Sequence, residues 1–154
     1  MSCFLSRGCL MSRTISEVAM GFLARREHSR HELVLKLLKK QFLPDEISTC
    51  LDSLEQRNYL SDSRFIASFT RYRANSGFGP KRIRADLLQR GIKAKIIDSY
   101  LASVAIDWES HLQQAWCKKF NQMPIDVKTL SKQTRFLLQR GFQPDSVRRL
   151  LKNF

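Results

Sequence analysis

No apolar run in the sequence approaches the roughly 20 residues that a transmembrane helix needs. No predicted helix combines a long polybasic face with a broad apolar one, so a membrane surface is not an expected partner. The first residues, MSCFLSRGCLMS, include an arginine and lack the apolar core of a secretory signal peptide. We therefore expect a cytoplasmic location, with Met11 as an alternative start of the chain.

Cysteine is scarce as well, and no two cysteines form a CxxC pair. The four are Cys3, Cys9, Cys50 and Cys117. A disulfide framework is not expected in a reducing cytosol. The two N-terminal cysteines could be combined with His28 and His31 into a zinc site, but the spacings fit no standard finger. The sequence therefore predicts no metal.

Motifs that carry catalysis are missing too. The sequence has no GxxxxGK[ST] loop and no HExxH, and its Gly-Phe-Gly lacks the third glycine and preceding strand of a dinucleotide site. No cysteine or serine sits in a recognisable nucleophile setting. We predict that the protein is not an enzyme and needs no cofactor.

Positive charge is abundant. The chain carries 27 Lys and Arg against 14 Asp and Glu, a net charge of +13. The excess is +2 in residues 1–61, +6 in residues 62–106 and +5 in residues 107–154. A positive field over the last two thirds predicts nucleic acid or an acidic protein surface as the partner.

The sequence repeats itself with a period of 50 residues. LLQRG occurs at Leu87–Gly91 and again at Leu137–Gly141, and LLKKQ stands one period earlier at Leu37–Gln41. A downstream apolar stripe recurs in the same register. Its three copies are Ile47/Cys50/Leu51/Leu54, Ile97/Tyr100/Leu101/Val104 and Val147/Leu150/Leu151/Phe154. This register predicts that Cys50 is a small core residue rather than a nucleophile.

Each copy is predicted to contain three helices, and sustained period-two alternation, which would indicate strands, is absent. The predicted fold is all-α: three tandem three-helix repeats stacked into an elongated, curved array. We expect a variable segment at 1–14 and repeats at 15–60, 61–106 and 107–154. In the third repeat Gln133 replaces the apolar residue of Leu33 and Ile83.

The middle repeat has a distinctive turn. Phe65, Phe69 and Tyr72 share one predicted helical face, more often a core stripe than a stacking platform. Gly77 and Gly79 then allow a sharp reversal, and Pro80 suits the first turn of a second helix. That helix has a predicted buried stripe of apolar residues and ends at a glycine suited to the left-handed conformation. These residues are Ile83, Leu87, Leu88 and Gly91.

Cations gather around this turn. Asp86 has helical spacing to Arg82 and Arg90 and is expected to pair with both. Four other cations of the middle repeat lack an acid at helical spacing. We predict that these four contact the partner, together with three cations of the third repeat. These seven are Arg71, Arg73, Lys81, Arg84, Lys132, Arg135 and Arg140. Phe78, between two glycines, either plugs its own repeat or meets the partner.

Three segments resemble the RecX family of bacterial RecA regulators. They are REHSRHEL (Arg26–Leu33), YLSDSRFIASF (Tyr59–Phe69) and GFGPKRIRADLLQRGI (Gly77–Ile92). The resemblance implies three tandem three-helix repeats, no enzymatic activity and no cofactor. It also implies binding in the groove of RecA filaments on DNA, which lowers RecA's ATPase, strand-exchange and co-protease activities in recombination, repair and the SOS response. Weak, non-specific DNA binding and a monomer are expected.

A DNA-binding regulator of the helix-turn-helix type is the alternative, because three-helix units with a basic helix resemble one superficially. The exposed face of that helix is partly neutralised by Asp86, however. It also lacks the Asn, Gln or Arg cluster of a base-reading helix.

Overall fold

The computed structural model describes residues 13–152. Over this range the chain forms α-helices and no strand, as predicted. Three units of three helices follow one another along the chain. The cysteines Cys3 and Cys9, the alternative start Met11 and the last stripe residue Phe154 lie outside the described residues.

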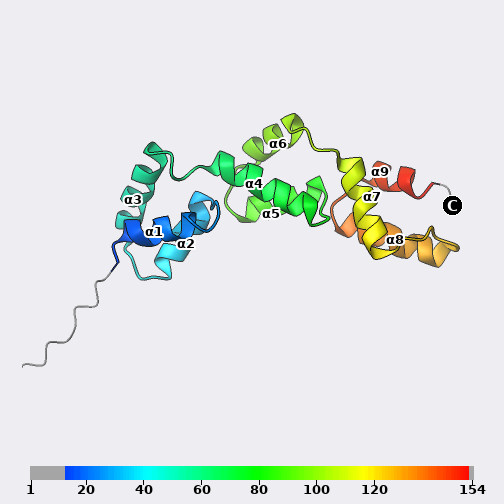
Figure 1. Cartoon of the computed structure of the whole chain (residues 1–154), viewed down its shortest axis with the longest axis horizontal. Helices are drawn as coiled ribbons and strands as arrows, with labels where there is room; N and C mark the ends of the chain where they lie inside the picture. Colours follow the sequence, from blue (N-terminus) through cyan, green and yellow to red (C-terminus); the bar gives the residue numbers. More distant parts are fainter. Residues whose placement is uncertain (1–12, 153–154) are drawn as a thin grey trace, which may run out of the picture.

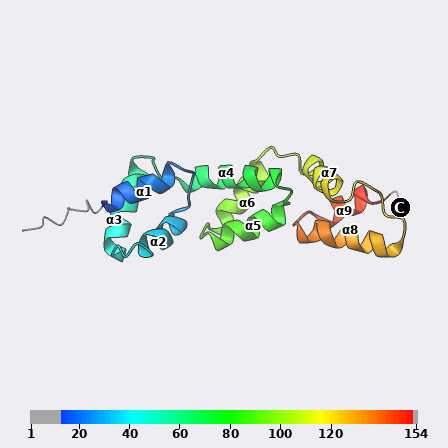
Figure 2. The ribbon, with the colours of Figure 1, turned by 60° about the horizontal axis from the view of Figure 1, so that its bottom comes forward.

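The units are arranged in a row. The first comprises α1 (Ile15–Leu23), α2 (Arg30–Leu38) and α3 (Pro44–Gln56). The second comprises α4 (Asp62–Asn75), α5 (Pro80–Gln89) and α6 (Ala94–Ser103). The third comprises α7 (Trp108–Lys119), α8 (Val127–Gln139) and α9 (Pro144–Leu150). The row is elongated and bowed, with the second unit at its crest in Figure 1. Figure 2 shows the same succession of units from below.

Capping residues and prolines mark the N-terminal ends of several helices. Thr14 and Glu17 form a reciprocal capping box at α1. At α2 the Ser29 hydroxyl accepts a hydrogen bond from the Glu32 backbone N–H. The Glu32 carboxylate pairs with Arg26 and Arg90 and does not complete a capping box. Proline stands in the first turn of α3, α5 and α9, where its missing N–H costs nothing.

Each unit has its own apolar core, and the cores are separate clusters. The register of the repeat holds: Leu37, Leu87 and Leu137 are all fully buried. Cys50 packs partly buried against the first core, and burial raises the pKa of its thiol, which suits the predicted apolar role.

Tyr72 and Leu88, predicted in the apolar stripes, are instead exposed, as is Leu38, the equivalent of Leu88 in the first unit. Tyr72 is 68% exposed, because the buried face of α4 runs through Ile66, Thr70 and Ala74. Leu38 and Leu88 are 41% and 39% exposed. A three-helix unit covers only one side of its second helix, so the flank of the stripe remains in solvent.

Gln133 occupies a core position of the third unit and is only 5% exposed. Its amide oxygen accepts a hydrogen bond from Trp116 Nε1 at 2.8 Å, and its nitrogen donates to the Gln122 carbonyl at 2.9 Å. The amide therefore ties α7 and the loop after it to α8, a connection that an apolar residue cannot make.

We expect Gln133→Leu to lower the free energy of unfolding by about 1–3 kcal/mol, because it leaves two polar groups without partners. Chemical denaturation followed by tryptophan fluorescence measures the change. Gln113→Leu, on the exposed face of α7, is the control and is expected to stay within about 0.5 kcal/mol of the wild type. Equal stability of the two variants would contradict the structural role of Gln133.

The junctions between units repeat one arrangement. Ser29 Oγ donates to the Arg90 carbonyl at 2.8 Å, and Gly79 N donates to the Arg140 carbonyl at 2.8 Å. In both pairs the partners are 61 residues apart. The start of the second helix in one unit thus meets the end of the second helix in the next.

This close approach explains the glycines. Gly91 and Gly141 have φ values of +78° and +89°, and a Cβ on either would lie 2.5 Å from the Cβ of His31 or Arg82 in the preceding unit. Gln41 holds the equivalent place in the first unit, also with positive φ (66°), and there no described unit precedes it.

Candidate partner-binding surface

The turn before α5 is built from its glycines and proline. Gly77 has φ +83°, the left-handed region that favours glycine. Gly79 is extended (φ −87°, ψ 172°), so Gly77 alone of the two supplies the left-handed conformation of this turn. A Cβ at Gly79 would nevertheless lie 2.5 Å from the carbonyl carbon of Gly141. Pro80 is the first residue of α5. The turn is therefore also a docking point for the third unit.

Phe78 lies half-buried at this docking point. The Arg73 guanidinium stacks on its ring, 3.7 Å from the centroid, and that of Arg140 lies 4.6 Å from it. Phe78 also packs against the core of the second unit. Within the chain the ring therefore fills the junction of two units, and its contact with a partner stays a prediction.

Two of the cations expected to lack acidic partners have them, and that expectation is wrong. Arg73 pairs with Asp86 at 2.5 Å, and Arg84 pairs with Asp98 at 2.6 Å. The hydrogen bond from Arg84 lowers the pKa of Asp98. Both partners come from a neighbouring helix, which spacing along one helix does not reveal.

Asp86 also differs from expectation in its second partner. It accepts a hydrogen bond from Arg82 Nε at 3.2 Å, as predicted. Arg90 instead contacts the Asp86 backbone carbonyl at 2.9 Å and forms an ion pair with Glu32 at 3.2 Å. The Arg90 guanidinium thus joins the second unit to the first.

Arg140 plays the matching part at the next junction. Its guanidinium lies between Phe78 and Phe136, 4.6 and 4.9 Å from the ring centroids, and donates to the Ser76 carbonyl at 3.4 Å. Sequence reasoning missed the linking role of Arg90 and Arg140, although their 50-residue separation marks them as equivalent. A partner-binding role for Arg140 remains a prediction.

Four predicted contact residues are exposed cations outside the ion pairs of the described chain. They are Arg71, Lys81, Lys132 and Arg135. Lys119 and Lys128, which the sequence analysis did not single out, extend this set. The signal was present, because Lys128, Lys132 and Arg135 follow i, i+4, i+7 spacing on α8. The structure thus places unpaired positive charge on the second and third units.

Other properties of the described chain bear on chemistry. Within residues 13–152, no group of three or more His, Cys, Asp or Glu side chains is placed to hold a metal ion. In the same range, no helix has the length and apolar character needed to cross a bilayer.

The fold and this surface define a class: a helical-repeat protein with exposed cations that take part in none of the ion pairs of the described residues. Family models for the first, second and third three-helix domains of RecX match residues 17–54, 61–101 and 107–151. The chain belongs to the RecX family, as its sequence resemblance indicated, and has the regulatory role of that family.

Individual relatives support the same assignment. The chain is 46% identical over 138 residues to "Regulatory protein RecX" from Pseudomonas fluorescens, covering 89% of both chains. The protein of the same name from Pseudomonas tolaasii matches with the same identity and coverage. The crystal structure of RecX from Lactobacillus salivarius superposes with a TM-score of 0.69 at 21% identity, covering 91% of this chain and 96% of that one. That likeness supports the fold.

Proposed function

We propose that this protein binds RecA filaments assembled on DNA and inhibits RecA's recombinase, ATPase and co-protease activities. By lying in the filament groove it restrains filament growth, and so regulates recombination, DNA repair and the SOS response. It acts in the cytoplasm, as a monomer and without catalysis or a cofactor, and binds DNA itself weakly and non-specifically. The proposed repeat boundaries are 15–60, 61–106 and 107–154.

The observation that carries this proposal is that an elongated row of similar units carries exposed cations without ion-pair partners within the described chain. The three units form one elongated row (Figure 1), a shape that suits contact with several subunits of a regular polymer. Unpaired cations on the second and third units, including Lys81, Lys132 and Arg135, suit an acidic or DNA-lined groove.

Co-sedimentation with RecA–DNA filaments tests the proposal, together with an assay of RecA's DNA-dependent ATPase. We expect the protein to pellet with filaments, to remain in solution with RecA alone or DNA alone at moderate salt, and to lower ATP hydrolysis. Absence from the filament pellet, or unchanged ATP hydrolysis, would reject the proposal.

The contact residues can be tested with four substitutions: Arg71→Ala, Lys81→Ala, Lys132→Ala and Arg135→Ala. Arg73 and Arg84 are not substituted, because each already forms an ion pair within the chain, with Asp86 and Asp98 respectively. Each exposed ionic contact contributes about 0.2–1 kcal/mol. The four together are therefore expected to weaken ATPase inhibition by about tenfold, within a range of roughly fourfold to several hundredfold. The helical circular-dichroism signal should not change.

A matched control removes four other exposed cations outside these ion pairs: Arg25→Ala, Arg57→Ala, Lys93→Ala and Lys95→Ala. It changes the net charge equally and is expected to inhibit like the wild type. If both quadruple variants lose inhibition equally, overall charge rather than this surface governs binding.

A helix-turn-helix DNA regulator remains the alternative. The pairing of Arg82 with Asp86 and of Arg84 with Asp98 neutralises part of the α5 surface, which disfavours base reading. Footprinting separates the two functions: a protected site at one sequence would favour the alternative, and salt-sensitive binding without a footprint favours the filament regulator.

A further inference from the structure

The third unit has a groove that its fold does not fill. It runs between the end of α7 and one face of α8 and encloses about 760 Å³. Its floor is mostly apolar, and its lining includes four cations and no acidic residue. The cations are Lys119, Lys128, Lys132 and Arg135, and the apolar residues are Phe120, Val127 and Phe136.

The cations of this groove are not used inside the described chain, because none of its ion pairs includes them. The acids of the third unit have other partners. Asp107 and Asp126 cap α7 and α8, and the hydrogen bond from the Thr129 backbone lowers the pKa of Asp126. Glu109 accepts from Ser146 and Arg149, and Asp145 pairs with Arg148. The groove therefore attracts negative charge from a partner.

The apolar part of the groove indicates which kind of acidic partner fits. Single-stranded nucleic acid uses open aromatic faces on which bases stack. Here the rings of Phe120 and Phe136 pack edge to face, with their centroids 5.3 Å apart, and the Arg140 guanidinium lies 4.9 Å from the Phe136 centroid. These contacts occupy ring surface that a stacked base would need. The most exposed apolar side chain of the lining is aliphatic: Val127 is 73% exposed, whereas Phe120 and Phe136 are half-buried.

We propose that this groove binds an acidic amphipathic segment of a protein. Its apolar side chains would pack on Phe120, Val127 and Phe136, as in other grooves that take one face of an amphipathic helix. Its carboxylates would pair with the lysines and arginine at the rim. Lys128 and Arg135 are seven residues apart on α8, so the row of cations is about 10 Å long and suits two successive helical turns of the ligand.

The probe is a fluorescein-labelled peptide of about 15 residues, with leucines at i, i+4 and i+7 spacing and glutamates elsewhere. A second peptide has serines in place of the leucines at the same charge, and the third probe is an oligothymidylate. Fluorescence anisotropy with the full chain gives the dissociation constants. We expect the leucine peptide to bind about tenfold or more tightly than the serine peptide.

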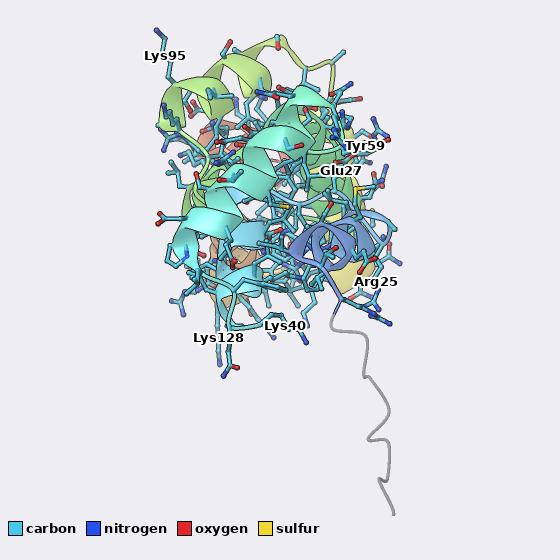
Figure 3. The ribbon with its side chains drawn as sticks, turned by 90° about the vertical axis from the view of Figure 1, so that its left-hand side faces the viewer. Arg25, Glu27, Lys40, Tyr59, Lys95 and Lys128 are labelled. Carbon is cyan, nitrogen blue, oxygen red and sulfur yellow. The ribbon has the colours of Figure 1, made fainter. Side chains whose placement is uncertain are left out.

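Two groove variants test the site: Lys128→Glu/Lys132→Glu and Val127→Asp. We expect each to weaken binding of the leucine peptide about tenfold or more. Lys93→Glu/Lys95→Glu is the charge-matched control and should bind like the wild type. Lys95 projects away from Lys128 when the molecule is viewed along its long axis (Figure 3).

Amide shifts in NMR spectra locate the bound peptide and are expected on α7, α8 and the loop between them. Equal binding of the two peptides, equal losses in the groove variants and the control, or tighter groove binding by oligothymidylate would each overturn the proposal. The inference shares Lys132 and Arg135 with the proposed filament contact, but its test contains no RecA. Either proposal can therefore fail without the other.

Discussion

Replacing Gly141 by alanine is expected to lower the free energy of unfolding by about 3 kcal/mol. Two effects combine. Gly141 has φ +89°, which an L side chain adopts only with strain, and the added Cβ would lie 2.5 Å from Arg82 Cβ and closer still to the Arg82 backbone nitrogen. A backbone atom at the start of α5 cannot move aside as a flexible side chain could, so the third unit would be forced away from the second.

Chemical denaturation followed by circular dichroism measures this loss, and limited proteolysis should show faster cleavage between the second and third units. Gly21→Ala is the matched control, because Gly21 lies within α1 and a Cβ there would meet nothing within 4 Å. It is expected to raise stability by about 0.5–1 kcal/mol. Similar effects of the two substitutions would contradict the close packing at the junction.

Asp86→Ala is the second substitution with a large expected effect, a loss of about 3 kcal/mol in unfolding free energy. Asp86 is only 7% exposed and accepts hydrogen bonds from Arg73 at 2.5 Å and Arg82 at 3.2 Å. Removing the carboxylate leaves the Arg73 guanidinium poorly hydrated and without its acid, and Arg73 Nε already has no hydrogen-bond partner in the described chain. We place the loss at the low end for buried pairs, because the Arg73 side chain retains 20% exposure.

Asp98→Ala is the control for this prediction. It breaks the ion pair between Asp98, whose side chain is 53% exposed, and Arg84, whose side chain is 41% exposed. The Arg84 guanidinium therefore stays hydrated after its acidic partner is removed. Urea denaturation should give a midpoint close to that of the wild type for Asp98→Ala and a clearly lower one for Asp86→Ala. Equal midpoints would mean that burial does not distinguish the two pairs.

The sequence allowed prediction of the three-unit fold because its repeat is visible in short, strongly apolar segments. The match of LLKKQ with the two copies of LLQRG set the register, and Leu37, Leu87 and Leu137 are buried in that register. The same reasoning failed for Tyr72 and Leu88. Spacing identifies the general side of a helix that faces inward, whereas the exact edge depends on how neighbouring helices cross it.

Prediction of the candidate surface was less complete, for a physical reason. Helical spacing shows ion pairs within one helix, but Arg73 and Arg84 pair with acids 13 and 14 residues away on a neighbouring helix. The contacts of Arg90 and Arg140 with the preceding unit likewise require knowledge of how units stack. Lys81, Lys132 and Arg135 are exposed, and within residues 13–152 no acidic side chain forms an ion pair with them.

Gln41 has a consequence for the stacking of units. Stacking one more unit ahead of the first would require bare backbone at this position, as at Gly91 and Gly141, and glutamine presents a side chain there instead. The first unit therefore differs from the other two in one physical respect: at its Gln41 position it cannot form the backbone contact that Gly91 and Gly141 make with the unit before them.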